Sequence, residues 1–487
     1  MEKLIQYKYL SRLFLYLSSL WLLLFFIFMP HYIELSETLE TWLPTKGLVM
    51  YKDIAMFHLP LGKLVLLPLH LISKWNLELD PFVGLAIGIA TLLFIYHFSK
   101  RFLSQKATSI ALIFFSLFYW FFGTSILYFH EQLIGLLLTA ALLLLFQLHK
   151  YKSISGKKIF RLGLILSLAE FSGQIASITV FVAALLAFYI LWKRKAQLLR
   201  NSLMLASGLA LPFAVLVLYF ISQSALWDFI YWTTLSYFTY AGFVTPISEL
   251  PFKELILFYL PLIILTFIFI YKLLKKEKIS FEFLTVFLLT ISSVPFITRS
   301  VFHPHHLNYP LGILAIAAGY SFDQLIKFKA GNKLFATTTV IFLFLGAFTL
   351  LSWYKSHITF PPSLKIVNDV YPGDPMFNAI EWVKKNTNSN NKLMVVGDPL
   401  FYMRSDRLTA SRPAKSIPYT WEPIEDVSSE ILQTPPIYWV VDRQFIKKLI
   451  VDYKKENMVR FLDGELKACY SLKETFENWE IWEKKCN

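Results

Sequence analysis

The chain contains a series of apolar runs long enough to cross a lipid bilayer, and this feature limits its fold more than any other. A helix needs roughly 20 apolar residues to span the hydrocarbon core. With 56% hydrophobic and only 16% charged residues, the sequence predicts an α-helical polytopic membrane protein with about eleven transmembrane helices and excludes a soluble globular protein. The predicted spans lie near 11–30, 81–98, 108–123, 131–148, 160–173, 174–192, 202–222, 254–274, 281–298, 310–326 and 335–353.

One further apolar run, from Pro60 to Trp75, does not fit as a crossing. If it crossed, the basic loop from Ser99 to Ala107 would lie outside and every later segment would be inverted. We therefore interpret it as a re-entrant or interfacial helix. The first apolar run follows basic residues and lacks a small-residue cleavage site, so we expect it to be retained as the first span.

The distribution of charge predicts the orientation. Of the 28 Lys and Arg residues before residue 355, 22 fall on one side of the predicted spans, and such an excess marks the cytoplasmic side. The N-terminus is then cytoplasmic, and residues 355–487 are extracytoplasmic. Those residues carry 19 basic and 18 acidic side chains, so the net charge of +14 reflects topology and not nucleic-acid binding.

The sequence predicts two domains, a membrane module at 1–354 with a first outer loop at 31–80, and an extracytoplasmic α/β domain at 355–487. In the second domain, helical spacing covers Phe377 to Thr387 and Arg443 to Tyr453. Strands are expected at Lys392–Val396, Pro436–Val441, Ala468–Leu472 and Trp479–Trp482. The two Cys of the chain, Cys469 and Cys486, both lie here and could form a disulfide in an oxidising compartment.

The first outer loop carries most of the candidate chemistry. A helix from Glu34 to Leu43 would be amphipathic, with an acidic face that includes Glu37 and Glu40 and that we expect to be solvated. Asp53 follows a turn at Gly47 and lies among apolar residues, so its carboxylate would be partly desolvated and a better base than a free one. The alternative is a structural ion pair with Lys52 or Lys63.

The order of these residues resembles a known family. An early acid, then Gly47, Tyr51-Lys52-Asp53, and His58 with Pro60 before a helix, together look like the GT-C glycosyltransferases that use polyprenyl-phosphate sugars. Within that fold, the chain is most similar to the protein-mannosyltransferase and aminoarabinose-transferase-like branch. The late segment RSVFHPHHLNYP, from Arg299 to Pro310, resembles that branch's late outer loop, and the tail resembles the outer domain of many bacterial members.

The resemblance implies transfer of a hexosyl or pentosyl group from a polyprenyl-phosphate donor to a hydroxyl of a glycan, lipid or protein acceptor. It places the reaction at the outer face of the plasma membrane, the inner membrane of a bacterium or an archaeon. The base would be Asp53 or Glu34. Cations would neutralise the leaving phosphate as its charge develops, and a single displacement would invert the anomeric centre. The implied phosphate contacts are Arg299, His305 or His306, and Lys63, with Tyr51 and Glu131 as further substrate contacts.

Several other side chains keep more than one interpretation. His58 could contact phosphate, bind a divalent cation with Asp53, or cap the helix that follows, and capping is preferred. His303, His305 and His306 could form a metal cluster, although close spacing in a loop seldom gives usable ligand geometry. The sequence therefore establishes no cofactor and leaves the need for a divalent cation, Mg²⁺ or Mn²⁺, open. Glu131 and Glu170, at outer ends of spans, should face the bundle interior.

Two other functional classes compete with the transferase. A transporter or flippase of a lipid-linked precursor would share the many spans, but such proteins often carry inverted repeats and ionisable residues near mid-span. This sequence has no evident repeat, and its acids gather in one outer loop. A catalytically silent scaffold for envelope assembly is the third interpretation.

Overall fold

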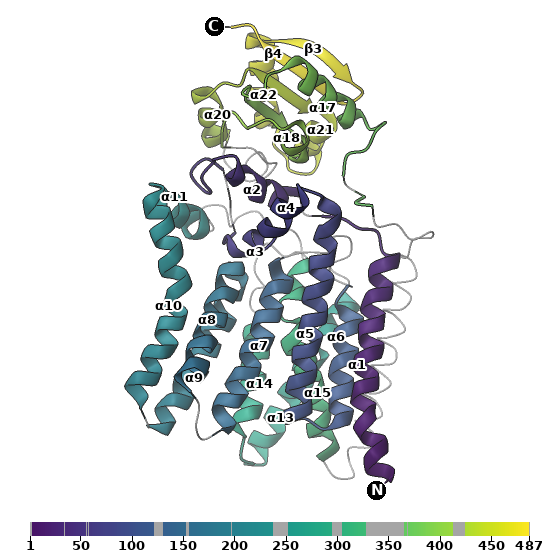
Figure 1. Cartoon of the computed structure of the whole chain (residues 1–487), viewed down its shortest axis with the longest axis vertical. Coiled ribbons are helices and arrows are strands. Elements are labelled where there is room, and N and C mark those ends of the chain that lie inside the picture. Colours follow the sequence, from purple (N-terminus) through teal and green to yellow (C-terminus); the bar gives the residue numbers. More distant parts are fainter. Residues whose placement is uncertain are drawn as a thin grey trace. The chain divides into compact units, whose positions relative to one another are not determined.

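The fold of the chain is seen in a computed structural model (Figure 1). It describes residues 2–33, 35–54, 56, 58–120, 130–151, 155–195, 197–236, 252–294, 304–327, 365–367, 369–412 and 424–486. The chain divides into two compact units. The first unit comprises Met1–Ile33, Leu59–Leu216 and Val244–Val367, and the second comprises Glu34–His58, Val217–Phe243 and Asn368–Asn487.

The first unit is a bundle of helices with an apolar interior. Helix α6 packs against both α1 and α15, and α7 packs against α5 and α8 (Figure 1). Most of the core consists of Leu, Ile, Ala and Phe side chains from these helices. The bounds are α1 Glu2–Phe28, α5 Asp80–Phe102, α6 Gln105–Phe118, α7 His130–Lys150, α8 Gly156–Ser172, α9 Ser177–Arg194, α10 Leu198–Ser222, α13 Phe252–Leu274, α14 Phe281–Ser292 and α15 Leu311–Lys327.

Six helices among the described residues are long and apolar enough to cross a membrane: Tyr9–Phe28, Leu77–Phe102, His130–Lys150, Gln174–Arg194, Leu198–Ser222 and Ile256–Leu274. Shorter apolar helices lie at Gln105–Phe118, Phe281–Ser292 and Leu311–Ile326. The predicted helical membrane architecture is thus confirmed, whereas the count of eleven crossings stays a prediction. The predicted span at 335–353 lies outside the described residues.

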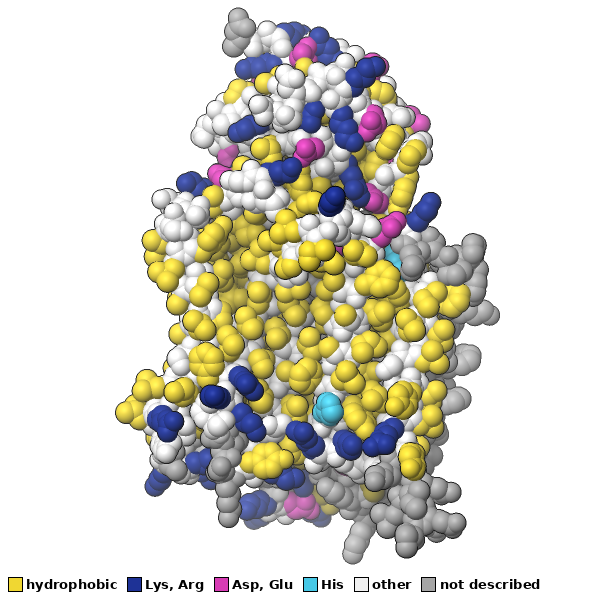
Figure 2. Space-filling model, viewed as in Figure 1, with side chains coloured by type: hydrophobic (Ala, Val, Ile, Leu, Met, Phe, Trp, Pro, Cys, Tyr) yellow, Lys and Arg dark blue, Asp and Glu magenta, His cyan; other side chains and the backbone are white. Residues whose placement is uncertain are grey.

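The outer surface of the bundle matches a helix bundle in lipid. Large apolar side chains are exposed on α1, α9 and α10, among them Tyr16, Phe181 and Leu203, and hydrophobic side chains cover much of the bundle in Figure 2. Helices α5, α7 and α9 each carry Lys or Arg in the last turn. They end at the side of the bundle where α1 begins (Figure 1). This grouping agrees with the charge pattern, and the membrane side that it faces remains a prediction.

The apolar run from Pro60 to Trp75 forms two short helices, α3 Leu61–Leu64 and α4 Leu67–Ser73, where the sequence suggested one. Pro68 causes the break because it lacks an N–H donor, and it lies at the start of α4, where that donor is not needed. A 3₁₀ turn, η1 Leu77–Leu79, then leads into α5. The re-entrant or interfacial placement of this hairpin stays a prediction.

The second unit contains a four-stranded mixed sheet. Its strands are β1 Leu393–Val396, β2 Tyr438–Asp442, β3 Tyr470–Phe476 and β4 Trp479–Lys484, in the order β1-β2-β4-β3. Strands β1 and β2 are parallel, and the other two pairs are antiparallel. The helices of this region are α17 Pro375–Asn386, α18 Leu400–Ser405, α20 Ile424–Gln433, α21 Arg443–Val451 and α22 Glu456–Cys469.

The same unit includes part of the first outer loop. Helix α2, Leu35–Thr45, confirms the predicted amphipathic helix and packs against α18. The expectation that Glu40 is solvated is wrong, because every residue from Thr38 to Leu43 is buried and Glu40 is only 1% exposed. The helix is enclosed on more than its apolar face, which a single-helix pattern cannot reveal. The side chain of Glu37 lies outside the described residues.

Candidate functional site

The first unit brings three titratable side chains together where α7 begins. Glu131 and His130 occupy the first turn of α7, and both are buried. The Nε2 atom of His130 lies 3.2 Å from Oε1 of Glu131, and Nε2 of His306 lies 3.7 Å from the same oxygen. His306 belongs to the 3₁₀ turn η6, Pro304–Asn308, from the late outer segment. One carboxylate therefore lies within ion-pair distance of two imidazoles.

Close backbone packing holds η6 and α3 against this helix end. A Cβ atom added at Gly135 of α7 would lie 3.0 Å from the carbonyl oxygen of Asn308, so glycine permits the approach of η6. A Cβ atom at Gly62 of α3 would lie only 2.3 Å from Cβ of His130. A Cβ atom at Gly173 would lie 2.9 Å from Cδ2 of His130. His130 is thus held between two glycines that leave no space for another carbon.

Lys63 is the residue after Gly62 and is buried, with 1% exposure, in α3. Helix α3 packs against α7 and α8, so this ammonium belongs to the same end of the bundle as Glu131. A buried ammonium is costly unless it meets polar or acidic groups. We define the acid–imidazole cluster as His130, Glu131 and His306, and Lys63 lies on the helix packed against it.

Glu170 supports the prediction that the outer-end acids face inward. It is only partly exposed, and its Oε1 accepts a hydrogen bond from the hydroxyl of Ser177. Glu131, at 1% exposure, is more deeply buried. Both findings follow from the high cost of placing a carboxylate against hydrocarbon.

Asp53 lies in the second unit, in a tight turn that fixes its carboxylate. Its Oδ2 accepts a hydrogen bond of 2.7 Å from the backbone N–H of Val49, and its own N–H donates to the carbonyl of Val49 at 2.9 Å. Lys52 does not pair with it: the ammonium of Lys52 lies 3.4 Å from the carbonyl oxygen of Gln223. Asp53 is half-buried, as expected for a partly desolvated carboxylate.

Tyr51 anchors this turn to the end of α10 and to α11, Leu226–Ile230. Its side chain is fully buried, and its ring packs edge-on against Phe220 and Phe229. Its hydroxyl donates to the carbonyl oxygen of His58 at 2.6 Å. The backbone of Tyr51 adopts a φ of +67°, which L residues seldom take. The aromatic contacts and the hydrogen bond offset that strain and hold the turn that carries Asp53.

The N-cap residue of α3 is Pro60, whose side chain makes no cap hydrogen bond. The capping role of His58 stays a prediction. Three other candidates lie outside the described residues: Glu34, Arg299 and His303. Nothing is described of the side chain of His305. From the predicted set, the structure therefore brings together Glu131 and His306. The roles of the residues that it does not describe stay predictions.

Sequence reasoning missed His130. The available signal was the polar pair His130-Glu131 at the start of an otherwise apolar run, where only Glu131 attracted attention. Its partner in space, His306, lies in a segment that no local pattern connects to α7.

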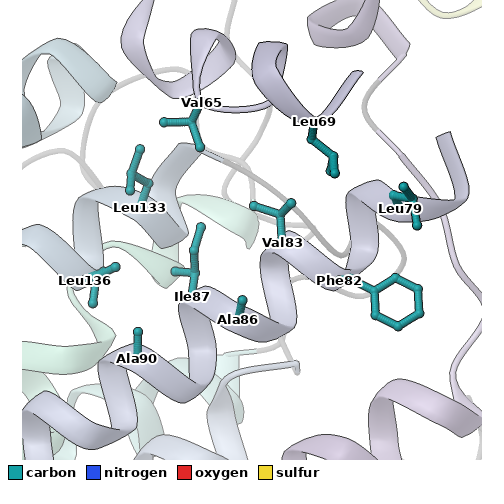
Figure 3. Close-up of a pocket in the computed structure, with 10 residues that line it drawn as sticks. All are labelled: Val65, Leu69, Leu79, Phe82, Val83, Ala86, Ile87, Ala90, Leu133 and Leu136. Atoms are coloured by element: carbon teal, nitrogen blue, oxygen red, sulfur yellow. The ribbon is translucent and has the colours of Figure 1, made fainter. Parts of the chain in front are cut away.

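An apolar groove with a volume of 420 Å³ lies at the same end of the bundle as the acid–imidazole cluster. One wall comes from Val65, which follows α3, from α4 and from η1, and the other comes from α5 and α7 (Figure 3). Leu133 and Leu136 line it from α7, within two turns of Glu131, and Val65 lines it two residues after Lys63. The other lining residues are Leu69, Leu79, Phe82, Val83, Ala86, Ile87 and Ala90.

No group of three or more His, Cys, Asp or Glu side chains among the described residues is arranged to hold a metal ion. The acid–imidazole cluster is therefore not arranged as a metal site.

No family model matches the sequence, and no curated protein matches it. The structure is similar to the oligosaccharyltransferase AglB of Archaeoglobus fulgidus solved with an inhibitory peptide and a dolichol-phosphate, at 11% identity and a TM-score of 0.56, over 98% of this chain and 74% of that one. It is also similar to ArnT of Cupriavidus metallidurans bound to undecaprenyl phosphate, at 10% identity and a TM-score of 0.54, over 99% of this chain and 98% of that one. The chain therefore has the GT-C fold that these transferases share.

Proposed function

We propose that the chain is a membrane-embedded glycosyltransferase that moves a sugar from a polyprenyl-phosphate donor to an acceptor hydroxyl. One observation carries the proposal. In a GT-C fold, a buried lysine and an acid–imidazole cluster lie at the same end of the bundle as an apolar groove. A lipid phosphate is complementary to this arrangement, because its charged head would meet the lysine and the imidazoles and its hydrocarbon chain would fill the groove.

The groove supports a hydrocarbon chain as its occupant. All ten lining residues are apolar, so no polar group inside it would be left without water when a chain enters. It lies in a bundle whose exposed surface is largely apolar (Figure 2), which gives a lipid chain access from the bilayer. ArnT has been solved with undecaprenyl phosphate and AglB with a dolichol-phosphate, and both are lipids of this class.

The cationic groups act on the phosphate in this proposal. Lys63 and the imidazoles of His130 and His306 neutralise the charge that develops as the glycosidic C–O bond breaks and the phosphate leaves with the electron pair. Glu131 acts as a positioning carboxylate that holds the two rings in a fixed orientation. Arg299 joins the phosphate contacts as a prediction from its sequence context, and so does His305.

The acceptor side requires a base, and we assign this role to Asp53, the carboxylate of the Tyr51-Lys52-Asp53 motif. Its carboxylate takes the hydroxyl proton as the acceptor oxygen bonds to the anomeric carbon. Glu34 remains the alternative base, and Tyr51 positions the turn of Asp53. A single displacement inverts the anomeric configuration. The acceptor can be a glycan, a lipid or a protein, and the sugar a hexose or a pentose.

The reaction takes place at the extracytoplasmic face in this proposal, with the N-terminus in the cytoplasm and the tail outside. The distribution of Lys and Arg supports this orientation. A. fulgidus oligosaccharyltransferase has been solved in a complex with zinc and sulfate, so a divalent cation is one component to add to and remove from the assay.

The test is binding of undecaprenyl phosphate to the purified full chain in lipid nanodiscs, followed by native mass spectrometry. We expect Lys63→Met to weaken binding roughly tenfold, because a charged hydrogen bond to phosphate is lost. Lys46→Met is the matched control, since Lys46 pairs with Asp406 at the surface of the second unit. Equal binding by all three proteins would remove Lys63 from the site.

A further inference from the structure

The outer wall of the apolar groove is held by a buried pair that the transferase chemistry does not use. Nε2 of His70 lies 2.7 Å from Oδ1 of Asp80, and both side chains are at most 3% exposed. His70 is on α4, and Asp80 is the first residue of α5. The bond therefore ties the second short helix of the hairpin to the start of a long helix of the bundle.

The segment between the two residues is a closed turn that ends at this bond. The backbone N–H groups of Lys74 and Trp75 both point to the carbonyl of His70, and both residues have positive φ angles. Asn76 then caps the turn η1 through the N–H of Glu78. The His70–Asp80 bond thus closes a compact segment, residues 70–80, that joins the end of α4 to η1 and α5.

This segment forms one wall of the groove. Leu69 and Leu79, each the residue immediately before a member of the pair, both line it. Across the groove lie Ala86 and Ile87 of α5 (Figure 3). The width of the groove depends on where α4 is held, and the link between His70 and Asp80 determines that position.

The polar nature of the link is informative. Two buried polar groups are seldom better for stability than apolar residues of the same size, because both must be desolvated. What a buried hydrogen-bonded pair provides is one defined arrangement, since any other leaves a carboxylate unpaired. Among the described residues, Nδ1 of His70 has no hydrogen-bond partner, so the bond to Asp80 is the one that orients the ring.

We propose that His70 and Asp80 are positioning residues that fix the α4 wall and thereby set the affinity of the groove for the long hydrocarbon chain of a polyprenyl phosphate. This inference rests on the proposed function. It assigns the pair to recognition of the chain, whereas the cluster around Glu131 acts on the phosphate. Loss of the pair therefore weakens the binding of long-chain lipid phosphates and leaves the binding of short-chain ones almost unchanged.

The experiment compares undecaprenyl phosphate with geranyl phosphate, which has the same head group and a short chain. Binding to the full chain in nanodiscs is measured for wild type, Asp80→Ala and His70→Gln. We expect Asp80→Ala to weaken the binding of undecaprenyl phosphate roughly tenfold and the binding of geranyl phosphate by less than about twofold. His70→Gln should keep a selectivity close to that of wild type, because the glutamine amide can donate a hydrogen bond to Asp80 from a similar position.

Further variants keep the outcome decisive. Ala86→Phe, which fills the groove, should produce the same selective loss, and Asp406→Ala, which breaks an exposed ion pair, should change neither affinity. If Asp80→Ala does not fold, the contrast between His70→Gln and His70→Leu replaces it. Equal weakening of both lipids, or no weakening of either, overturns the inference. Failure of wild type to bind either lipid instead overturns the proposed function.

Discussion

Nε2 of His306 lies 3.7 Å from Oε1 of Glu131, although the two residues are 175 positions apart in the sequence. The late outer segment and the start of α7 meet at this contact, with His130 on the other side of the same oxygen. A buried carboxylate with two imidazoles near it is a costly arrangement, and for this reason we assign the cluster a role in the proposed reaction.

The carboxylate of Glu131 should be required for its charge and not for its size. Glu131→Gln keeps the shape but removes the group that orients both imidazoles, and we expect turnover to fall roughly 10²-fold, as small misplacements of catalytic groups commonly cause. The measurement is kcat and KM with a polyprenyl-phosphate sugar. Glu170→Gln, at another outer helix end, is the control. Similar rates for both variants would contradict the role of Glu131.

The glycines around His130 should not tolerate a methyl group. Gly62→Ala would place a Cβ atom 2.3 Å from Cβ of His130, and overpacking of this kind costs about 1–3 kcal/mol. Gly464→Ala is the control, because no atom lies within 4 Å of the added carbon. That exposed helical position should gain about 0.5–1 kcal/mol. Thermal unfolding of both variants in detergent checks the contrast, and equal shifts would contradict it.

The hairpin of β3 and β4 should lose stability in acid. The pKa of Glu483 is lowered by its hydrogen bonds to Lys473 and Tyr438. A lowered pKa in the folded state means that the carboxylate stabilises the fold above the unfolded-state pKa, and that this contribution disappears as the pH falls through the folded-state value. The protection factors for hydrogen exchange of β4 should therefore fall below about pH 4.5, and less so in Lys473→Met. Identical profiles in both proteins would contradict this.

The two cysteines are close enough to be tested for a bond. Both are free thiols here, and the N–H of Cys486 points to the carbonyl oxygen of Cys469 at 3.4 Å. If the tail faces an oxidising compartment, protein that is isolated and denatured without reductant should contain no thiol that reacts with maleimide. Two reactive thiols in freshly isolated, unfolded protein would show that the predicted bond does not form.

The secondary structure of the tail was largely predictable. Three of the four strands lie within about two residues of their expected bounds, because short apolar runs bounded by polar turns identify buried strands. The exception is β3, which continues to Phe476, four residues past its expected end. Helix α22 was not predicted, since Gly464 and many charged residues weaken its pattern. Its buried residues Met458, Val459, Leu462 and Leu466 nevertheless follow helical spacing, so the signal was present.

The site was predictable in its residue types but not in its arrangement. Lys63, Glu131 and His306 could be named because charged or imidazole groups stand out in apolar surroundings. Their partners could not, because Glu131 and His306 meet only through packing of η6 against α7, and His70 meets Asp80 only through a closed turn. Burial of Glu40 has the same origin, since α18, far along the chain, packs against α2.

The most direct test of the central claim is turnover of polyprenyl-phosphate sugars by the purified protein in lipid. A panel of undecaprenyl-phosphate hexoses and pentoses is offered to wild type and to Asp53→Asn, whose amide keeps the hydrogen bond from Val49 but cannot accept a proton. The account predicts that wild type consumes one donor and releases undecaprenyl phosphate, and that Asp53→Asn is slower by roughly 10²–10⁴-fold. Consumption of no donor, or equal rates for the two proteins, would contradict it.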